Sequence, residues 1–307
     1  MEHFYSHGKL LLTGEYVVLD GALALAVPSK YGQSLAIEKE KSGMLKWTSL
    51  DENNAPWFST VFTIHDNELT SEKAPCSELS QRLLQILNAA KQLNPEFLTG
   101  DKGYQVSTSL EFPKNWGLGT SSTLITNIAQ WAKIDPYALL DLTFGGSGYD
   151  IACARATKSL TYQLEDTQNN VQRHISTVDF TPPFSDNLYF VFLNQKQNSR
   201  DGIKRYRQHA TNVSVEIETI NTITQRMIDC PSLSSFQQLI NDHEQIISTL
   251  IKETPIKKRL FNDFKGSIKS LGAWGGDFIL VASKENPSSY FKTKGYNTIL
   301  SYTEMVF

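Results

Sequence analysis

The sequence PKNWGLGTSS at residues 113–122 joins a predicted strand, residues 104–110, to a predicted helix whose apolar run begins at Leu124. Gly117 and Gly119 let backbone N–H groups turn inward without interference from a Cβ atom. The helix start adds unpaired N–H donors and a partial positive charge, and this combination suits a phosphate group. Hydroxyl groups that can bind phosphate oxygens or a magnesium ion come from Thr120, Ser121 and Ser122. The alternative is a glycine-rich turn with Ser/Thr caps.

A second glycine-rich segment, GGSGYD at residues 145–150, places an acidic residue directly after a tight turn. The carboxylate of Asp150 can orient the hydroxyl group of an acceptor molecule and take its proton. A lysine nearby would keep this carboxylate ionised. The alternative is an aspartate that caps the following helix.

A third segment, GKLLLTGEY at residues 8–16, brings a single lysine into an apolar strand. Lys9 needs a partner if this strand is buried, because lysines are seldom buried alone. If Lys9 meets Asp150, its charge favours the ionised carboxylate and stabilises charge on a transferred phosphoryl group. The alternative is a surface lysine whose stem lies along apolar surface. The neighbouring His7 is expected to be an ordinary polar residue.

A fourth segment, GAWGGD at residues 272–277, lies between a predicted polar helix ending near Lys269 and a predicted strand at residues 278–282. It is another loop in which glycines permit unusual backbone angles. A helix C-cap at Gly272 is the alternative, although such a cap does not explain three glycines followed by an aspartate.

Length and composition favour a globular protein of two lobes. The 307 residues exceed one ordinary domain of roughly 100–200 residues. Hydrophobic residues make up 40% and charged residues 20%, which indicates an ordered chain. The net charge of −3 and the pI near 6.1 provide no general field for polyanions. A nucleic-acid partner is therefore not expected.

Three cysteines, Cys76, Cys153 and Cys230, are too far apart to indicate a disulfide framework or a zinc site. They fit a reducing cytoplasm. The N-terminus shows no signal peptide, and no segment approaches the roughly 20 apolar residues that cross a bilayer. We expect a cytoplasmic protein without a membrane partner, either a monomer or a homodimer.

Other elements follow from local patterns. Residues 10–27 are predicted to form a β-hairpin, with turn signals at Thr13-Gly14-Glu15 and at Asp20-Gly21. Pro182-Pro183 marks a predicted boundary between domains at residues 1–182 and 183–307. Apolar residues at helical or strand spacing predict helices at residues 77–92, 202–227 and 233–251 and a strand at residues 188–193.

Taken together and in this order, the four segments resemble the sequence blocks of the GHMP kinases, named for galactokinase, homoserine kinase, mevalonate kinase and phosphomevalonate kinase. Residues 113–122 are similar to the family's P-x-x-x-G-L-G-S-S phosphate loop, with Thr120 in place of the first serine. Residues 272–276 are similar to its third glycine motif. The resemblance spans most of the chain. It implies an α+β, two-lobed fold with an N-terminal lobe of the ribosomal protein S5 domain 2 type and a ferredoxin-like C-terminal lobe.

The resemblance also implies roles for individual residues. Asp150 falls on the position of the catalytic aspartate, and Lys9 on the lysine that pairs with it. ATP and Mg²⁺ are the implied cofactors, with magnesium near Ser121 and with Asp141 as the closest candidate for a second ligand. The ATP phosphates are expected over Gly117, Leu118, Gly119, Thr120, Ser121 and Ser122. The acceptor is expected to contact Lys9, Glu15, Tyr16, Ser147, Gly275, Gly276 and Asp277.

Three features depart from the family pattern. Trp274 stands where relatives usually have glycine, and a narrower pocket is the expected result. His7 stands where proline is common. The stretch that links the phosphate loop to Asp150 is unusually short, which predicts a trimmed helical layer beside the nucleotide.

The acceptor is predicted from two further positions. Phosphomevalonate kinases tend to show G-E-Y and G-G-D, as at residues 14–16 and 275–277, whereas mevalonate kinases usually show G-E-H. A phosphorylated acceptor would also suit the basic residues Lys196, Arg200, Lys204, Arg205 and Arg207, unless these form a solvated helix face. Phosphomevalonate is the predicted acceptor. The alternatives are mevalonate or another small alcohol, and a nucleotide or metabolite sensor that has lost turnover.

Overall fold

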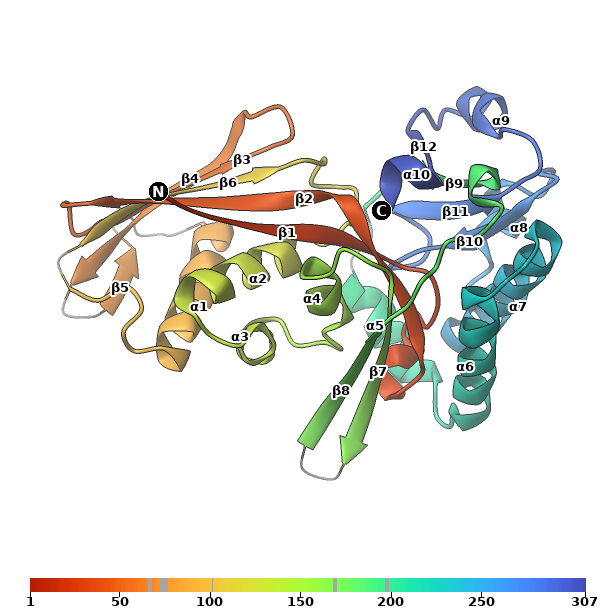
Figure 1. Cartoon of the computed structure of the whole chain (residues 1–307), viewed down its shortest axis with the longest axis horizontal. Coiled ribbons are helices and arrows are strands. Elements are labelled where there is room, and N and C mark those ends of the chain that lie inside the picture. Colours follow the sequence, from red (N-terminus) through yellow and green to blue (C-terminus); the bar gives the residue numbers. More distant parts are fainter. Residues whose placement is uncertain (66–67, 72–76, 101, 168–169, 197–198) are drawn as a thin grey trace. The chain divides into compact units, whose positions relative to one another are not determined.

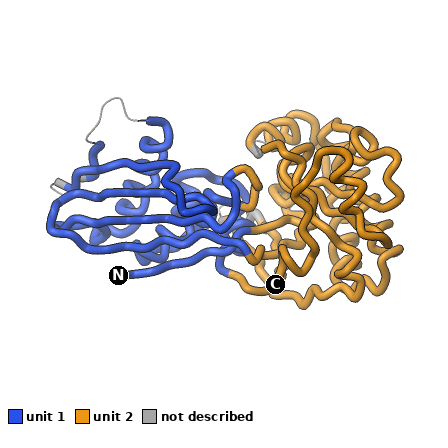
Figure 2. The backbone as a smooth tube through the Cα atoms, turned by 90° about the horizontal axis from the view of Figure 1, so that it is seen from above, with its two compact units in different colours: residues 1–8, 31–114, 119–155 blue, residues 9–30, 115–118, 156–307 orange. Residues whose placement is uncertain are grey.

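The computed structural model describes residues 1–65, 68–71, 77–100, 102–167, 170–196 and 199–307. The chain forms two compact units that alternate along the sequence (Figure 2). Unit 1 comprises residues 1–8, 31–114 and 119–155, and unit 2 comprises residues 9–30, 115–118 and 156–307. The residues of each unit pack closely together in space, although they come from separate stretches of the sequence. The division of the chain into domains at residue 182 stays a prediction.

A mixed sheet forms the framework of unit 1. Its strands follow the order β5-β4-β3-β6-β2, with β1 paired to β2, and the part of β2 that belongs to unit 2 continues the sheet through β7 and β8. β3 and β6 are parallel, and the pairs β2–β6, β3–β4 and β4–β5 are antiparallel. The strands are β1 (Glu2–Leu11), β2 (Ala24–Glu40), β3 (Met44–Leu50), β4 (Pro56–His65), β5 (Glu68–Ser71) and β6 (Gly103–Leu110).

Helices cover one face of this sheet (Figure 1). They are α1 (Glu78–Leu93), α2 (Thr120–Ala132), α3 (Pro136–Thr143) and α4 (Tyr149–Ala154). Alternate strand residues such as Leu45 and Trp47 point into the same buried cluster as Leu83 and Leu87 of α1. Burial of such side chains contributes about 1.5–3 kcal/mol each, so the helical face fixes the register of the strands.

A four-stranded antiparallel sheet with the order β10-β11-β9-β12 forms the core of unit 2. β11 is buried along its whole length. Its strands are β9 (Leu188–Phe192), β10 (Ser267–Ser270), β11 (Phe278–Ala282) and β12 (Ile299–Ser301). Its helices are α5 (Ser199–His209), α6 (Ser214–Ile228), α7 (Leu233–Ile251), α8 (Ile256–Leu260), α9 (Ser288–Thr293) and α10 (Tyr302–Met305). Unit 2 also carries an antiparallel hairpin of β7 (Leu160–Thr167) and β8 (Asn170–Thr177), and the short 3₁₀ helices η1 (Val17–Asp20) and η2 (Ser185–Asn187).

The predicted α+β class is confirmed, and so are the predicted strands at residues 104–110, 188–193 and 278–282 and the helices at residues 77–92 and 233–251, within a residue or two at their ends. The helix near residue 77 begins after Ser77, whose side chain accepts from the Ser80 N–H. Cys76 lies outside the described residues.

Two local predictions were wrong. Residues 202–227 form two helices, because Thr211 and Asn212 interrupt the helical run where polar side chains compete for backbone groups. Lys269 ends no helix and lies in β10. The hairpin predicted over residues 10–27 does form, because β1 pairs with β2, and its connection contains a tight turn at Tyr16 followed by η1.

Candidate functional site

The first candidate region is the start of α2. Gly119 is its N-cap, with φ 94° in the left-handed region, and no side chain caps the helix. The first-turn N–H groups of a helix have no partners within the helix, and the first turn of α2 contains no acid that would repel an anion. Ser121 is exposed in this turn, whereas the hydroxyl of Ser122 donates to Gly119 O at 2.8 Å. The helix start therefore suits a bound phosphate group.

The second candidate region is the start of α4. Its N-cap is Gly148, with φ 90°. Asp150 is partly exposed in the first turn and accepts a hydrogen bond from the Ile151 N–H at 3.1 Å. The position of a capping aspartate is thus occupied by a glycine, which disfavours the simple capping role for Asp150. Ser147 precedes the helix and is buried.

The predicted magnesium ligands both belong to unit 1. Ser121 lies at the start of α2 and Asp141 is exposed on α3, which packs against α2. Within the described ranges, no group of three or more His, Cys, Asp and Glu side chains is arranged to hold a metal ion. Magnesium in nucleotide sites usually takes one or two protein ligands and completes its shell with phosphate oxygens and water. A hydroxyl and a single carboxylate fit that chemistry.

The third candidate region joins Lys9 to the glycine loop within unit 2. The Lys9 Nζ atom donates to Gly117 O at 2.8 Å, and the Lys9 backbone N–H donates to Leu118 O at 2.9 Å. The side chain is half-buried, so it is not simply a surface lysine. A Cβ atom on Gly117 would lie 2.5 Å from the carboxyl group of Asp277. One lysine and one aspartate thus flank the same glycine.

The fourth candidate region is the loop at residues 272–277, which is strained and largely buried. Trp274 and Asp277 adopt φ angles of 39° and 49°, in the left-handed region that disfavours side chains. Backbone hydrogen bonds hold the end of the loop, since the Asp277 N–H donates to Gln195 O at 2.7 Å. On the other side, the Arg259 guanidinium lies over Gly275 and donates to its carbonyl at 3.4 Å.

Glu15 lies in a buried cluster of ionisable groups that the sequence did not indicate. Its carboxylate forms an ion pair with Lys269 of β10 and lies 3.3 Å from His243 Nε2 of α7. The next residue of α7, Glu244, accepts from the N–H of Ser270 at 2.9 Å and from its hydroxyl at 3.2 Å. The side chains of Glu15, His243 and Lys269 are at most 1% exposed.

Burial dominates the pKa values of this cluster. It raises the pKa of Glu15, an effect that Lys269 opposes. Burial raises the pKa of Glu244 to about 8, again opposed by Lys269. Burial and then the charge of Lys269 lower the pKa of His243 well below its usual value, so the ring is neutral at pH 7. His243 Nε2 can therefore accept the Gly14 N–H at 3.0 Å.

Tyr16 follows Glu15 and packs on α5. Its ring stacks on Tyr206 with 5.9 Å between centroids. A Cβ atom on Gly202 of α5 would lie 2.9 Å from the Tyr16 ring, so the two are in close contact. Burial raises the pKa of Tyr16, and the hydroxyl is buried without a hydrogen-bond partner among the described residues. An unsatisfied buried hydroxyl indicates a group that a ligand or water molecule can complete.

Two of the predicted basic residues are already paired with acids. Arg205 forms an ion pair with Glu253, and Arg207 forms one with Asp20 at 2.6 Å. Their charges are therefore less available to bind an anionic acceptor than the sequence predicts. Lys204 is exposed on α5.

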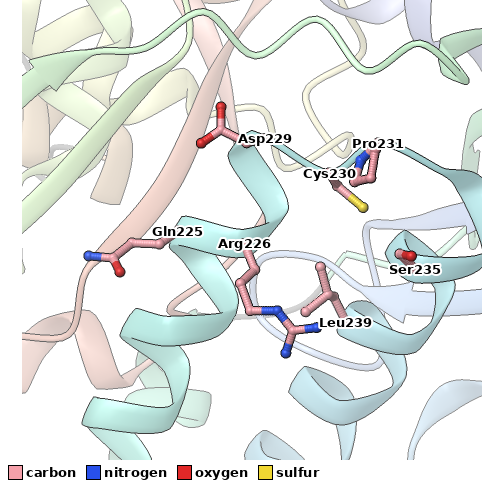
Figure 3. Close-up of a pocket in the computed structure, with 7 residues that line it drawn as sticks. All are labelled: Gln225, Arg226, Asp229, Cys230, Pro231, Ser235 and Leu239. Carbon is pink, nitrogen blue, oxygen red and sulfur yellow. The ribbon is translucent and has the colours of Figure 1, made fainter.

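A separate hollow lies at the end of α6 and the beginning of α7 (Figure 3). Its volume is about 440 Å³, and it is open to solvent. The residues that line it are Gln225, Arg226, Asp229, Cys230, Pro231, Ser235 and Leu239. None of them is a predicted site residue. Where the chain is described, no helix has the length and apolar character needed to span a bilayer.

The predicted site residues belong to both units. Unit 1 contains Gly119–Ser122, Asp141, Ser147 and Asp150, and unit 2 contains Lys9, Glu15, Tyr16, Gly117, Leu118 and Gly275–Asp277. Unit 2 brings Lys9 and Asp277 to Gly117 and buries Glu15 against Lys269 and His243. The pairing of Lys9 with Asp150 would join the units and stays a prediction.

Comparison with known proteins gives a result only at the level of structure. No family model matches the sequence, and no curated protein matches it. Solved structures match nearly the whole chain. The Methanococcus jannaschii mevalonate kinase matches with a TM-score of 0.69 and 15% identity, covering 97% of this chain and 96% of that one. The chain has the GHMP kinase fold.

Two further structures support the GHMP kinase fold. Streptococcus pneumoniae phosphomevalonate kinase in complex with phosphomevalonate and AMPPNP matches with a TM-score of 0.70 and 15% identity, over 96% of this chain and 95% of that one. Lactococcus lactis galactokinase complexed with galactose matches with a TM-score of 0.68 and 14% identity, over 100% and 93%. The resemblance seen in the four sequence segments is thereby confirmed as a likeness of fold.

Proposed function

We propose that the protein transfers a phosphoryl group from ATP to a hydroxyl group of a small-molecule acceptor. The observation that carries this proposal is the contact of Lys9 Nζ with Gly117 O, which puts a cation on the glycine loop that leads into α2. A cation on a glycine loop that continues into a helix with unpaired first-turn N–H donors suits a polyphosphate. The GHMP kinase fold supports the proposal, because the matched structures include kinases with three different named acceptors.

The proposed mechanism gives each residue one task. The N–H groups at the start of α2 bind phosphate oxygens, with Gly117–Ser122 as the phosphate loop. Ser121 and Asp141 would hold Mg²⁺, which when bound supplies charge neutralisation of the triphosphate. Asp150 orients the acceptor hydroxyl and takes its proton, and Lys9 stabilises the charge that develops on the transferred group.

Residues of unit 2 are proposed to bind the acceptor. Asp277 lies against Gly117, and the Tyr16 hydroxyl is a buried donor without a partner in the described part of the chain. Gly275, Gly276 and the unit 1 residue Ser147 complete the proposed set. A hydrogen bond to an acceptor oxygen would satisfy the Tyr16 hydroxyl.

Phosphomevalonate is the proposed acceptor. The residues Gly14-Glu15-Tyr16 and Gly275-Gly276-Asp277 support it, as does the fold similarity to a kinase solved with phosphomevalonate. Mevalonate is the second candidate. The ion pairs of Arg205 and Arg207 favour it, since they leave less positive charge for a second phosphate group.

A coupled assay of ATP consumption with phosphomevalonate and then mevalonate tests the proposal. We expect turnover with one of them at least tenfold above the other in kcat/KM. The Tyr16→Phe variant should raise the acceptor KM about tenfold, the value of one lost hydrogen bond, and leave the ATP KM unchanged. If ATP binds and no acceptor from a broad panel of alcohols accelerates its hydrolysis, the protein is a nucleotide sensor and the proposal is wrong.

A further inference from the structure

The turn at Tyr16 is strained and must be held by its surroundings. The Val17 N–H donates to Glu15 O at 2.8 Å, which closes a three-residue turn with Tyr16 at its centre. Tyr16 has φ 64° and ψ −51°, the rare form of this turn, in which a side chain is disfavoured. Residues in such conformations persist only where the surrounding structure fixes them, and they cluster at functional sites.

The surroundings that fix this turn are the buried ionisable residues. On one side of Tyr16, the Gly14 N–H donates to His243 Nε2, and the Glu15 carboxylate pairs with Lys269. Lys269 is fully buried and also donates to Ser270 O at 3.0 Å. The contacts of Gly14 and Glu15 end on α7 and β10, so the turn is attached to two rigid elements.

The same cluster reaches the loop at residues 272–277. Ser270 follows Lys269 in β10 and donates from both its N–H and its hydroxyl to the Glu244 carboxyl group. Leu271 then leads into the glycine loop, at whose end Asp277 lies against Gly117. One buried cluster thus supports the two stretches of unit 2 that are proposed to bind the acceptor.

We propose that Glu15, Lys269, His243 and Glu244 form a positioning unit that holds the strained turn so that the Tyr16 hydroxyl meets the acceptor. This inference rests on the proposed function and assigns Glu15 an indirect role. Its carboxylate acts through the position of Tyr16 rather than by touching the acceptor. A buried ion pair is weak evidence for stability alone, because an apolar pair of similar volume is often as stable. A role in specifying conformation explains why the pair is buried at this point.

A double-mutant cycle tests the proposal. In the Glu15→Gln/Lys269→Met background no buried charge loses its partner, so the protein should fold. We expect its acceptor KM to rise about tenfold while the ATP dissociation constant stays within twofold. Adding Tyr16→Phe to this background should change the acceptor KM less than twofold, against about tenfold in the wild type. Additive effects would overturn the proposal, because they would mean that the cluster does not act through Tyr16.

A control variant and a second measurement complete the test. Thr108→Val removes a buried hydroxyl that donates to Ser49 at 2.9 Å in unit 1, and its effect should add to that of Tyr16→Phe. Amide hydrogen exchange needs no turnover. The amides of Gly14 and Val17 should exchange at least tenfold faster in the Glu15→Gln/Lys269→Met variant, with α1 unchanged. Unchanged exchange at both amides would overturn the positioning unit even if the protein is a kinase, whereas absent turnover in the wild type would overturn only the proposed function.

Discussion

The helix starts of unit 1 and the glycine loop of unit 2 use left-handed backbone in opposite ways. α2 and α4 begin after Gly119 and Gly148, so their left-handed residues carry no side chain. In the loop of unit 2, Trp274 and Asp277 occupy left-handed positions and are 2% and 8% exposed. Such residues cost about 1–3 kcal/mol each in strain, which buried contacts must offset.

The two regions therefore differ in what their side chains need: the helix starts can stay accessible to a ligand, whereas the loop needs buried contacts to hold its backbone. An unstrained helix start can leave its first turn accessible, as Ser121 and Asp150 are here. A strained loop needs packing and hydrogen bonds on every side. In the loop at residues 272–277, the Asp277 N–H donates to the Gln195 carbonyl and the Arg259 side chain donates to the Gly275 carbonyl. Changes at the helix starts are therefore expected to alter ligand binding and turnover. Changes beneath the loop or beside Tyr16 are expected to alter stability as well as acceptor binding.

The largest effect is expected from Asp150→Asn at the start of α4. Turnover should fall by about 10² to 10⁴, because the amide cannot take the proton of the acceptor hydroxyl. The ATP dissociation constant and the melting temperature should stay close to those of the wild type. Steady-state kinetics and nucleotide titration measure both quantities. Near-normal turnover would remove Asp150 from the mechanism.

Gly119→Val tests the other helix start. A β-branched residue at φ 94° is strained, and its side chain would occupy space that a phosphate needs. We expect ATP to bind about 10- to 100-fold more weakly, as measured by calorimetry. Unaltered ATP affinity in the folded variant would show that the nucleotide does not bind at the start of α2.

Glu244→Gln tests the support beneath the loop of unit 2. The folded-state pKa of Glu244 is about 8 against 4.5 as the ordinary value, so between these pH values the unfolded chain has lost a proton that the folded chain retains. The wild type should therefore lose stability as pH rises through this window, with an upper limit of about 1.4 kcal/mol per pH unit. The difference between wild type and variant isolates Glu244, because the other groups of the cluster are common to both. Denaturant unfolding measures the free energy of unfolding at pH 6 and at pH 8. Between these pH values it should fall by about 2 kcal/mol less in the variant than in the wild type. Equal slopes would contradict the raised pKa.

Gly202→Ala gives the smallest effect and tests the contact of α5 with Tyr16. Alanine normally stabilises a helix interior by about 1 kcal/mol relative to glycine. Here its Cβ atom would overlap the Tyr16 hydroxyl, so we expect a loss of about 1 kcal/mol in thermal unfolding. Tyr16→Phe in the same chain should recover part of the loss. Asn241→Ala, at an exposed position of α7, is the matched control and should be neutral or stabilising.

The sequence alone determined the features that depend on local pattern. Periodic apolar residues predicted α1, α7 and β11, and the glycine motifs predicted the loops before α2 and α4. Their order along the chain indicated the GHMP kinase fold, which the structural comparisons confirm. These predictions succeeded because side-chain spacing and glycine placement act over a few residues. The roles of Lys9 and Asp150 stay predictions.

Which polar groups meet depends on the tertiary packing. Glu15 and Lys269 are 254 positions apart, and nothing in either segment indicates the other. The polar residues before Lys269 predict the end of a helix, yet Lys269 lies fully buried in β10. The basic residues between 196 and 207 predict a site for an anion that includes Arg205 and Arg207, but the structure pairs both of these arginines with acids. The partners in these ion pairs are determined by how elements far apart in the sequence pack around one core. Such packing produces no periodic pattern in the local sequence, so the pairs could not be predicted from it.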